Sequence, residues 1–222
     1  MCALRKTIII TAAGEGKRMY SKLPKQFSNL NGKPILMHTI RRFYRIDPKF
    51  EIILTLPENH LQTWKELCLE HDFQIPHHTV NGGEERFHSV KNALNFSTGD
   101  LIGVHDGVRP VISRKMVNHL YEEAAKKGAV VPVIEINQSL RKIKGNSSES
   151  VDRSEYRIVQ TPQVFKSDIL NKAYKNSYQK DITDDATLVE RVGHKVYMIP
   201  GDINNIKITF PRDMLLAEEL LG

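Results

Sequence analysis

Short apolar runs alternate along this chain with longer segments in which apolar residues recur every three or four positions. The runs are rich in Ile, Val and Leu and predict buried strands at residues 7–11, 51–55, 101–105 and 129–133. The periodic segments predict helices at residues 34–45, 60–70 and 114–127. Such a βαβ series gives a mainly parallel, twisted sheet flanked by helices. The fold class is therefore α/β, with ligands expected at the carboxyl ends of the strands.

The alternation stops after Val133. Residues 134–141 and 156–159 are predicted to be extended, and the polar stretch 144–152 is predicted to be a loose connection between them. We expect a single domain over residues 1–222 with a protruding arm at about 134–160, which packs against another subunit because it cannot bury both of its faces alone. Further elements are predicted as helices at 167–176, 184–192 and 211–221 and a strand at 196–199.

Composition limits the class of protein. The chain has 222 residues, of which 40% are hydrophobic, enough for one domain with a full core. No long apolar run and no apolar leader with a cleavage site is apparent, so we expect no membrane span and a cytoplasmic location. Cys2 and Cys68 are far apart and lack nearby Cys or His partners, which argues against a disulfide framework or a zinc site.

The net charge of +6 has two interpretations, namely nucleic-acid binding or collection of small polyanions. The chain has no run of five or six basic residues and no basic stripe interleaved with aromatic residues, and several basic residues adjoin Gly, Pro or Asp in predicted loops. This distribution favours small polyanions, and we expect no nucleic-acid partner.

The loop after the first strand carries the strongest candidate chemistry. Its small residues, Ala12, Ala13, Gly14 and Gly16, let backbone N–H groups approach an anion, and basic residues follow at Lys17, Arg18 and Lys25. It is not a P-loop, because Thr11 and Arg18 stand where that motif has Gly and Ser or Thr, and Met19 excludes the dinucleotide fingerprint. The plainer alternative is a strand-turn-helix corner with solvated charges.

A second loop contains Gly82 and Gly83 and opens into a predicted helix that carries Ser89. Exposed N–H groups there, with the Ser89 hydroxyl, form a platform for a base or ribose. The alternative is a simple Gly-Gly turn.

A third loop, after the strand at 101–105, places Asp106, Gly107 and Arg109 together. Asp106 is suited to holding Mg²⁺ or a polar substrate, and Arg109 to gripping a phosphate. The alternative is a structural Asp–Arg pair. His105 is interpreted as a packing residue, since no other ligand is spaced for a metal.

Three later positions complete the candidates. Thr161 offers a hydroxyl group beside Pro162, and Thr183 or Asp184 is interpreted as a helix cap because Asp184 and Asp185 face different sides of a helix. Lys207 stands between apolar residues in a predicted strand, as a phosphate ligand or an edge-strand lysine that blocks pairing.

In order and spacing, these motifs resemble the 2-C-methyl-D-erythritol 4-phosphate cytidylyltransferase family over nearly the whole chain. The resemblance implies a Rossmann-like nucleotidyltransferase fold with an extended β-arm. It also implies transfer of CMP from CTP to 2-C-methyl-D-erythritol 4-phosphate, releasing pyrophosphate, in the non-mevalonate route to isoprenoid precursors. A Mg²⁺ ion bound largely through the CTP phosphates and a homodimer formed through the arm are further implications.

The resemblance also assigns residues. It implies catalytic roles for Arg18, Lys25, Lys207 and Arg153. The implied nucleotide-binding positions are Ala12, Ala13, Gly14, Gly16, Lys25, Gly82, Gly83, Ser89, Asp106 and Gly107. The implied acceptor positions are Asp106, Arg109, Ser139, Arg153, Thr161 and Lys207, with Ser139 and Arg153 supplied by the partner's arm.

This chain departs from the family's usual pattern at Ser139, where Thr is more common, and at Gly107, where many members have Ala. Ser keeps the hydroxyl group, and Gly keeps the loop small. Two alternatives stay open at this point: a ribitol-5-phosphate cytidylyltransferase, and a non-catalytic nucleotide- or RNA-binding protein.

Overall fold

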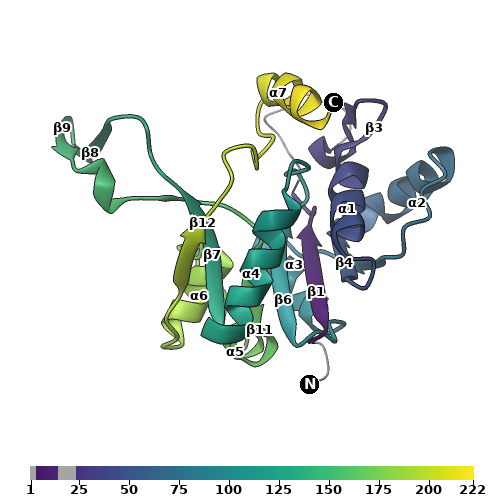
Figure 1. The fold of residues 1–222 in the computed structure, drawn as a ribbon, viewed down its shortest axis with the longest axis horizontal. Helices are drawn as coiled ribbons and strands as arrows, with labels where there is room; N and C mark the ends of the chain where they lie inside the picture. The colour runs from purple at the N-terminus through teal and green to yellow at the C-terminus, as the bar shows by residue number, and fades with distance from the viewer. Residues whose placement is uncertain (1–3, 15–23) are drawn as a thin grey trace.

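The computed structural model describes residues 4–14 and 24–222. At the centre of its sheet, β1 (Lys6–Thr11) pairs in parallel with β4 (Glu51–Leu56) on one side and with β6 (Leu101–Asp106) on the other. The next strand outward, β5 (His78–Asn81), pairs in parallel with β4. The carboxyl ends of these four strands therefore meet at one edge of the sheet (Figure 1).

The other half of the sheet is mixed. The strand β11 (Gln163–Lys166) lies antiparallel between β6 and β7 (Ala129–Ile134). Beyond it, β12 (Tyr197–Pro200) pairs in parallel with β7, and β10 (Ile158–Val159) pairs antiparallel with it. The prediction of a mainly parallel α/β sheet is confirmed, although the sequence pattern did not predict β11.

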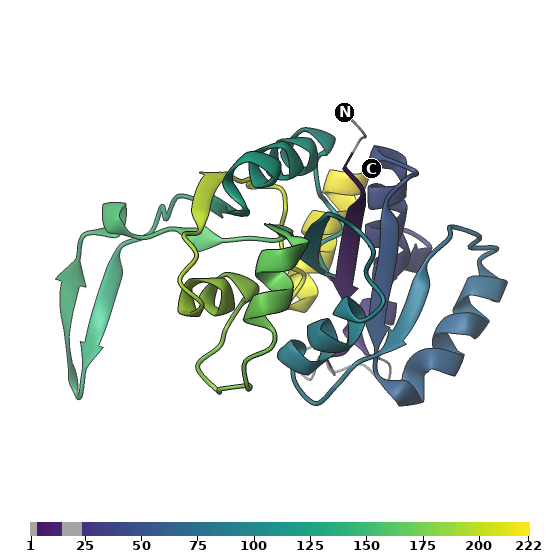
Figure 2. The same ribbon diagram turned by 90° about the horizontal axis from the view of Figure 1, so that it is seen from below.

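Helices cover both faces of the sheet (Figures 1 and 2). One cluster joins α1 (Ile35–Ile46) and α4 (Arg114–Lys127) to the sheet face that carries Ile8 and Ile10. The opposite cluster joins α3 (Arg86–Leu94), α5 (Ser167–Ala173) and α6 (Asp185–Arg191) to the face that carries Ile9.

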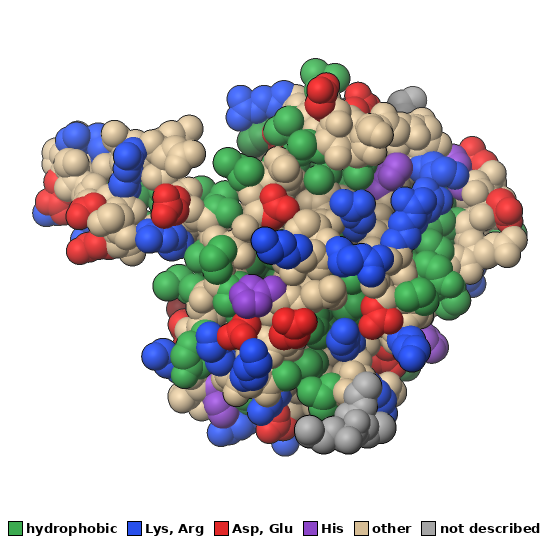
Figure 3. All heavy atoms as spheres, viewed as in Figure 1, with side chains coloured by type: hydrophobic (Ala, Val, Ile, Leu, Met, Phe, Trp, Pro, Cys, Tyr) green, Lys and Arg blue, Asp and Glu red, His purple; other side chains and the backbone are tan. Residues whose placement is uncertain are grey.

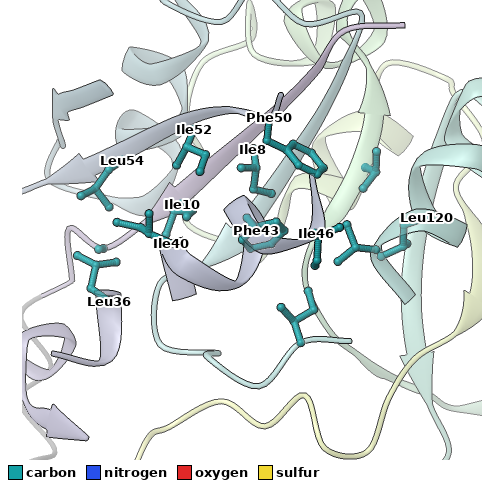
Figure 4. Packing of buried hydrophobic residues seen from close by; sticks show 14 of the residues in the cluster. Ile8, Ile10, Leu36, Ile40, Phe43, Ile46, Phe50, Ile52, Leu54 and Leu120 are labelled. Atoms are coloured by element: carbon teal, nitrogen blue, oxygen red, sulfur yellow. The ribbon is translucent and has the colours of Figure 1, made fainter. Parts of the chain in front are cut away.

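Strand alternation produces these two clusters. Consecutive side chains of a strand point to opposite faces, so a run of Ile on β1 supplies both layers, and Ile8, Ile9 and Ile10 are fully buried. Figure 4 shows Ile8 and Ile10 beside Phe43 of α1. A central strand buried on both faces reads as a continuous apolar run, as the sequence of β1 does.

The remaining short elements surround this core. They are η2 (Lys25–Phe27), β2 (Asn29–Leu30), β3 (Lys33–Pro34), η3 (Glu58–His60), α2 (Leu61–Glu70) and α7 (Pro211–Leu221). The bounds of α4 and α7 agree with the predicted helices, because Ser113 caps the first by accepting from the Met116 amide and Pro211 opens the second at its first turn. Within the described residues, no helix combines the length and apolar character needed to cross a membrane.

The arm differs from its prediction. The stretch 144–152, expected to be a loose connection, is largely one strand of a hairpin formed by β8 (Leu140–Lys144) and β9 (Ser147–Val151). A turn with Gly145 at φ 58° joins the strands, and glycine adopts this left-handed conformation without a steric penalty. The one-turn helix η4 (Arg153–Glu155) follows. The hairpin stands away from the sheet (Figure 1).

The predicted strand around Lys207 is also wrong. The segment joins no sheet, and the Ile208 amide donates to the Val108 carbonyl oxygen at 3.0 Å. Ile206 and Ile208 instead pack in a small cluster with residues of α7, so the apolar neighbours that indicated a strand have a different burial site. Lys207 therefore pairs with Asp106, the last residue of β6, and is not an edge-strand lysine.

Candidate active site

A cavity of about 290 Å³ lies at the carboxyl ends of β1 and β6. It brings together residues from five separate stretches of sequence. The predicted residues that line it are Ala12, Ala13, Gly14, Lys25, Gly83, Ser89, Asp106 and Lys207. The position agrees with the expectation that ligands of a parallel sheet bind beyond its carboxyl edge.

The loop after β1 forms one wall. The Ala12 amide donates to the Thr55 carbonyl oxygen at 3.0 Å, which continues the pairing of β1 with β4 by one residue. The buried Gln26 side chain donates to the Ala12 carbonyl oxygen at 2.6 Å and fixes the loop against η2. Lys25, at the start of η2, is 9% exposed and lines the cavity. The predicted residues Gly16 and Arg18 lie outside the described residues.

The Gly82–Gly83 loop approaches that wall closely. A Cβ atom on Gly82 would lie 2.5 Å from the Cβ atom of Ala13, so only glycine fits there. The Ser89 hydroxyl accepts from the Gly83 amide at 3.1 Å and donates to the Glu85 carbonyl oxygen at 3.2 Å. Ser89 therefore holds the loop in place while lining the cavity, whereas Gly82 lies behind it.

Asp106 is the buried charge of the site. Its Oδ2 atom accepts from Arg109 Nε at 2.9 Å and contacts Lys207 Nζ at 3.1 Å. Burial alone would raise the pKa of Asp106, but the positive charges of Lys207, Arg86 and Arg109 outweigh it and hold this pKa well below its ordinary value. The carboxylate is therefore ionised and orients Lys207, which is 46% exposed, over the cavity.

A second layer supports Asp106 from behind. Thr161 Oγ1 accepts from the Asp106 amide at 3.1 Å and contacts His105 Nδ1 at 3.1 Å, and Arg109 Nη1 donates to the Asn205 carbonyl oxygen at 2.8 Å. Burial lowers the pKa of His105 to about 4, so it packs as a neutral ring, as predicted. Arg109 and Thr161 do not line the cavity, and the Asp–Arg pair offered as the alternative is present.

Gly107 joins the Asp106 loop to the loop after β1. Its amide donates to the Thr11 carbonyl oxygen at 2.9 Å, and its carbonyl oxygen accepts from Thr39 Oγ1 at 2.9 Å. A Cβ atom here would lie 3.1 Å from that of Ala12, a tight contact. Gly107 thus supports the cavity without lining it.

The arm residues lie elsewhere. Ser139 and Arg153 are exposed on the arm and do not line the cavity of their own chain. Arg153 Nη1 donates to the Asn137 carbonyl oxygen at 2.5 Å, a contact within the arm. The hairpin carries both basic and acidic side chains (Figure 3).

Sequence reasoning missed Arg86 and Asp185 as functional candidates. Arg86 lines the cavity, and its Nη1 and Nη2 atoms donate to Asp185 Oδ1 and Oδ2 at 2.9 and 2.6 Å. The two residues are 99 positions apart, and no sequence signal indicates that they pair. The neighbouring carboxylate, Asp184, accepts from the Thr187 amide at 3.0 Å, so the predicted helix cap is confirmed.

Asp106 decides whether the cavity can hold a metal ion. Among residues 4–14 and 24–222, no group of three or more His, Cys, Asp or Glu side chains could hold a metal ion. A Mg²⁺ ion that arrives with a nucleotide needs only one or two carboxylates, since phosphates and water fill its other positions. Asp106 is a buried carboxylate on the cavity wall and fits that limited role.

A buried acidic residue surrounded by bases, at the carboxyl edge of a mainly parallel sheet, defines an α/β protein with a site for a phosphorylated ligand. The sequence model of the 2-C-methyl-D-erythritol 4-phosphate cytidylyltransferase family matches residues 6–222. The chain therefore belongs to this family of cytidylyltransferases.

Individual relatives agree. The chain is 46% identical over 217 residues to the 2-C-methyl-D-erythritol 4-phosphate cytidylyltransferase of Bacteroides fragilis, covering 97% of this chain and 99% of that protein. The crystal structure of the Thermus thermophilus enzyme of that name is 31% identical with a TM-score of 0.79, covering 96% and 97% of the two chains. The bifunctional IspDF of Campylobacter jejuni is 25% identical with a TM-score of 0.81, covering 96% of this chain but only 54% of that longer one.

Proposed function

We propose that this protein transfers CMP from CTP to 2-C-methyl-D-erythritol 4-phosphate, giving 4-diphosphocytidyl-2-C-methyl-D-erythritol and pyrophosphate. Membership of the family supports the reaction. The observation that carries it to this chain is the cavity in which Lys25, Asp106 and Lys207 meet the small residues after β1. That wall suits the phosphates of a nucleotide, because cationic side chains line it beside small residues that let an anion approach the backbone.

The chemistry needs no protein nucleophile. An oxygen of the acceptor's phosphate monoester attacks the α-phosphorus of CTP, and the bond to the β-phosphate oxygen breaks as pyrophosphate leaves. The phosphate is already anionic near neutral pH, so the protein aligns two polyanions and stabilises the charge of the transition state. Lys25 and Arg18 stabilise the negative charge of the transition state. Lys207, oriented by Asp106, holds the phosphate of the acceptor.

A divalent cation belongs to this proposal. Mg²⁺ would neutralise charge on the CTP phosphates when bound, with Asp106 as the protein carboxylate within the cavity that suits it.

The acceptor side of the site is proposed to include a second copy of the chain. Ser139 and Arg153 lie on an arm that stands away from its own cavity. Apolar side chains on and beside the arm are exposed to solvent: Ile143 by 73%, Tyr156 by 45% and Ile158 by 47%. Several exposed apolar side chains on one projecting segment favour burial against a partner. A homodimer that exchanges arms would bring the partner subunit's Arg153 to the acceptor.

We place the protein in the cytoplasm, consistent with a free thiol at Cys68. Its partners are CTP, the acceptor and a second copy of itself.

The test is pyrophosphate release from CTP and Mg²⁺ with either 2-C-methyl-D-erythritol 4-phosphate or ribitol 5-phosphate at equal concentration. We expect strong preference for the first acceptor. Preference for ribitol 5-phosphate would keep the chemistry and overturn the acceptor. Tight CTP binding with no pyrophosphate from either acceptor would overturn the transferase assignment.

A further inference from the structure

The cavity wall formed by α3 contains an ion pair that the proposed chemistry does not use. Arg86 is the first residue of α3, directly after the Gly82–Gly83 loop, and it lines the cavity. Asp185 is the first residue of α6, is fully buried, and does not line the cavity. Two hydrogen bonds of 2.9 and 2.6 Å join both terminal guanidinium nitrogens of Arg86 to both carboxylate oxygens of Asp185. This bidentate geometry fixes the plane of the guanidinium group.

Asp185 is itself held firmly. The Tyr174 hydroxyl donates to Asp185 Oδ1 at 2.5 Å. The start of α6 is anchored further by Gln163, which accepts from the Ala186 amide at 2.9 Å and donates to Asp184 at 2.8 Å. A buried carboxylate with this many fixed partners does not change rotamer easily.

The side chain of Arg86 is not enclosed like its partner. It is 31% exposed, against 0% for the Asp185 side chain. A guanidinium group has five N–H bonds, and the pair with Asp185 uses two of them. The other three have no hydrogen-bond partner among the described residues, and Arg86 lines the cavity, so we expect them to be open to a ligand there. The positive charge also reaches across the cavity, since Arg86 is among the groups that lower the pKa of Asp106.

We propose that Asp185 is a positioning residue that acts through Arg86, and that Arg86 donates a hydrogen bond to an oxygen atom of the bound nucleotide. This assignment rests on the proposed function, because it takes the cavity to be the CTP site. It adds a nucleotide contact from α3 and a support from α6, a helix outside the cavity. A buried ion pair is a poor source of stability but an effective way to fix one side chain in one geometry.

The chain offers a matched control on the same helix. Arg191 of α6 forms an ion pair with Asp181 at 2.5 Å, and neither residue lines the cavity. Arg191→Lys and Asp181→Asn therefore repeat the chemical changes of Arg86→Lys and Asp185→Asn at a surface pair.

The experiment measures CTP binding by calorimetry in the absence of acceptor, together with KM and kcat for each substrate. Lysine keeps the charge of Arg86 but loses the planar fork, so Arg86→Lys should weaken CTP binding about tenfold and raise KM for CTP more than KM for the acceptor. Asp185→Asn should produce a loss of the same size. Because both changes act on one group, the double variant should be no weaker than the worse single variant. The two control variants should bind CTP within twofold of wild type.

Several results would overturn the assignment. One is CTP affinity within twofold of wild type in Arg86→Lys. Another is additive losses in the double variant, which would mean that Asp185 does not act through Arg86. If Asp185→Asn fails to fold, the Arg86→Lys binding result alone still decides whether the guanidinium contacts the nucleotide. Failure of the wild-type protein to bind CTP would instead overturn the proposed function, so the two failures are distinguishable.

Discussion

The cavity and the arm hold their functional side chains in opposite ways. In the cavity, Asp106 is fixed by Arg109, Lys207 and the Thr161 hydroxyl, all within one chain. On the arm, Arg153 is exposed, and among the described residues its side chain bonds only to the nearby Asn137 carbonyl oxygen. Under the proposed function, a single chain preorganises the nucleotide side, and a second subunit would complete the acceptor side.

The largest expected effect comes from the preorganised side. Lys25→Ala should lower kcat by about 10²–10³-fold, since it removes a cation aimed at charge that develops during transfer. Initial rates of pyrophosphate release measure this loss. The matched control is Lys126→Ala, an exposed lysine that contacts only Glu123 in the described structure. Near-wild-type turnover in folded Lys25→Ala would remove the catalytic role.

The arm should give a smaller loss that is confined to one substrate. Arg153→Ala is expected to lower kcat/KM for the acceptor by about 10–100-fold, as loss of a charge-assisted phosphate contact does, with CTP binding unchanged. Lys144→Ala, which breaks an exposed ion pair with Glu149 on the same hairpin, is the control. Equal losses of kcat/KM for CTP and for the acceptor would show that Arg153 does not act on the acceptor alone.

The close approach of the Gly82–Gly83 loop to the loop after β1 provides a third test. Gly82→Ala would place a Cβ atom 2.5 Å from that of Ala13, so the nucleotide wall must shift. We expect KM for CTP to rise about tenfold. Gly107→Ala, with nearest contacts of 3.1 Å, should change KM less. An equal rise in KM for CTP in both variants would contradict the conclusion that the contact of Gly82 with Ala13 is the tighter constraint.

The smallest effect is on stability. The pKa of His105 is lowered to about 4 in the folded protein from 6.5, because the buried ring is desolvated. The unfolded chain binds this proton below pH 6.5 and the folded chain does not, so up to about 3 kcal/mol of stability is lost as the pH falls from 6.5 to 4.

Urea unfolding at pH 7.5, 6 and 4.5 checks this dependence. His105→Gln should be less stable at pH 7.5 yet lose less stability on acidification. His119→Gln, at an exposed position of α4, is the control and should follow wild type. Parallel pH profiles for wild type and His105→Gln would contradict the assignment.

Much of the fold could be predicted because its signals are local. The apolar runs of β1, β4, β6 and β7 and the periodicity of α4 report burial directly. The antiparallel strand β11 has only four residues and begins with Gln163, so neither its length nor its pattern reveals it. The β8–β9 hairpin is exposed and polar, and no apolar alternation marks its strands.

The candidate site divides in the same way. Small residues and basic residues that follow a strand can be recognised in the sequence, and eight predicted residues do line the cavity. The Arg86–Asp185 pair joins helices 99 residues apart, and only the three-dimensional fold brings them together. Arg109 and Thr161 have the right chemistry but lie behind Asp106, which only the packing reveals.

Subunit complementation tests most directly whether the arm of one subunit completes the cavity of the other. Activity is measured at an acceptor concentration below KM, where Lys25→Ala and Arg153→Ala should each keep about a tenth of wild-type activity or less, and the two variants are mixed under conditions that allow subunits to exchange. If the arm serves the partner's cavity, half of the dimers are mixed and each has one intact site of two, which restores about a quarter of wild-type activity. A mixture no more active than the mean of the two variants would contradict the account.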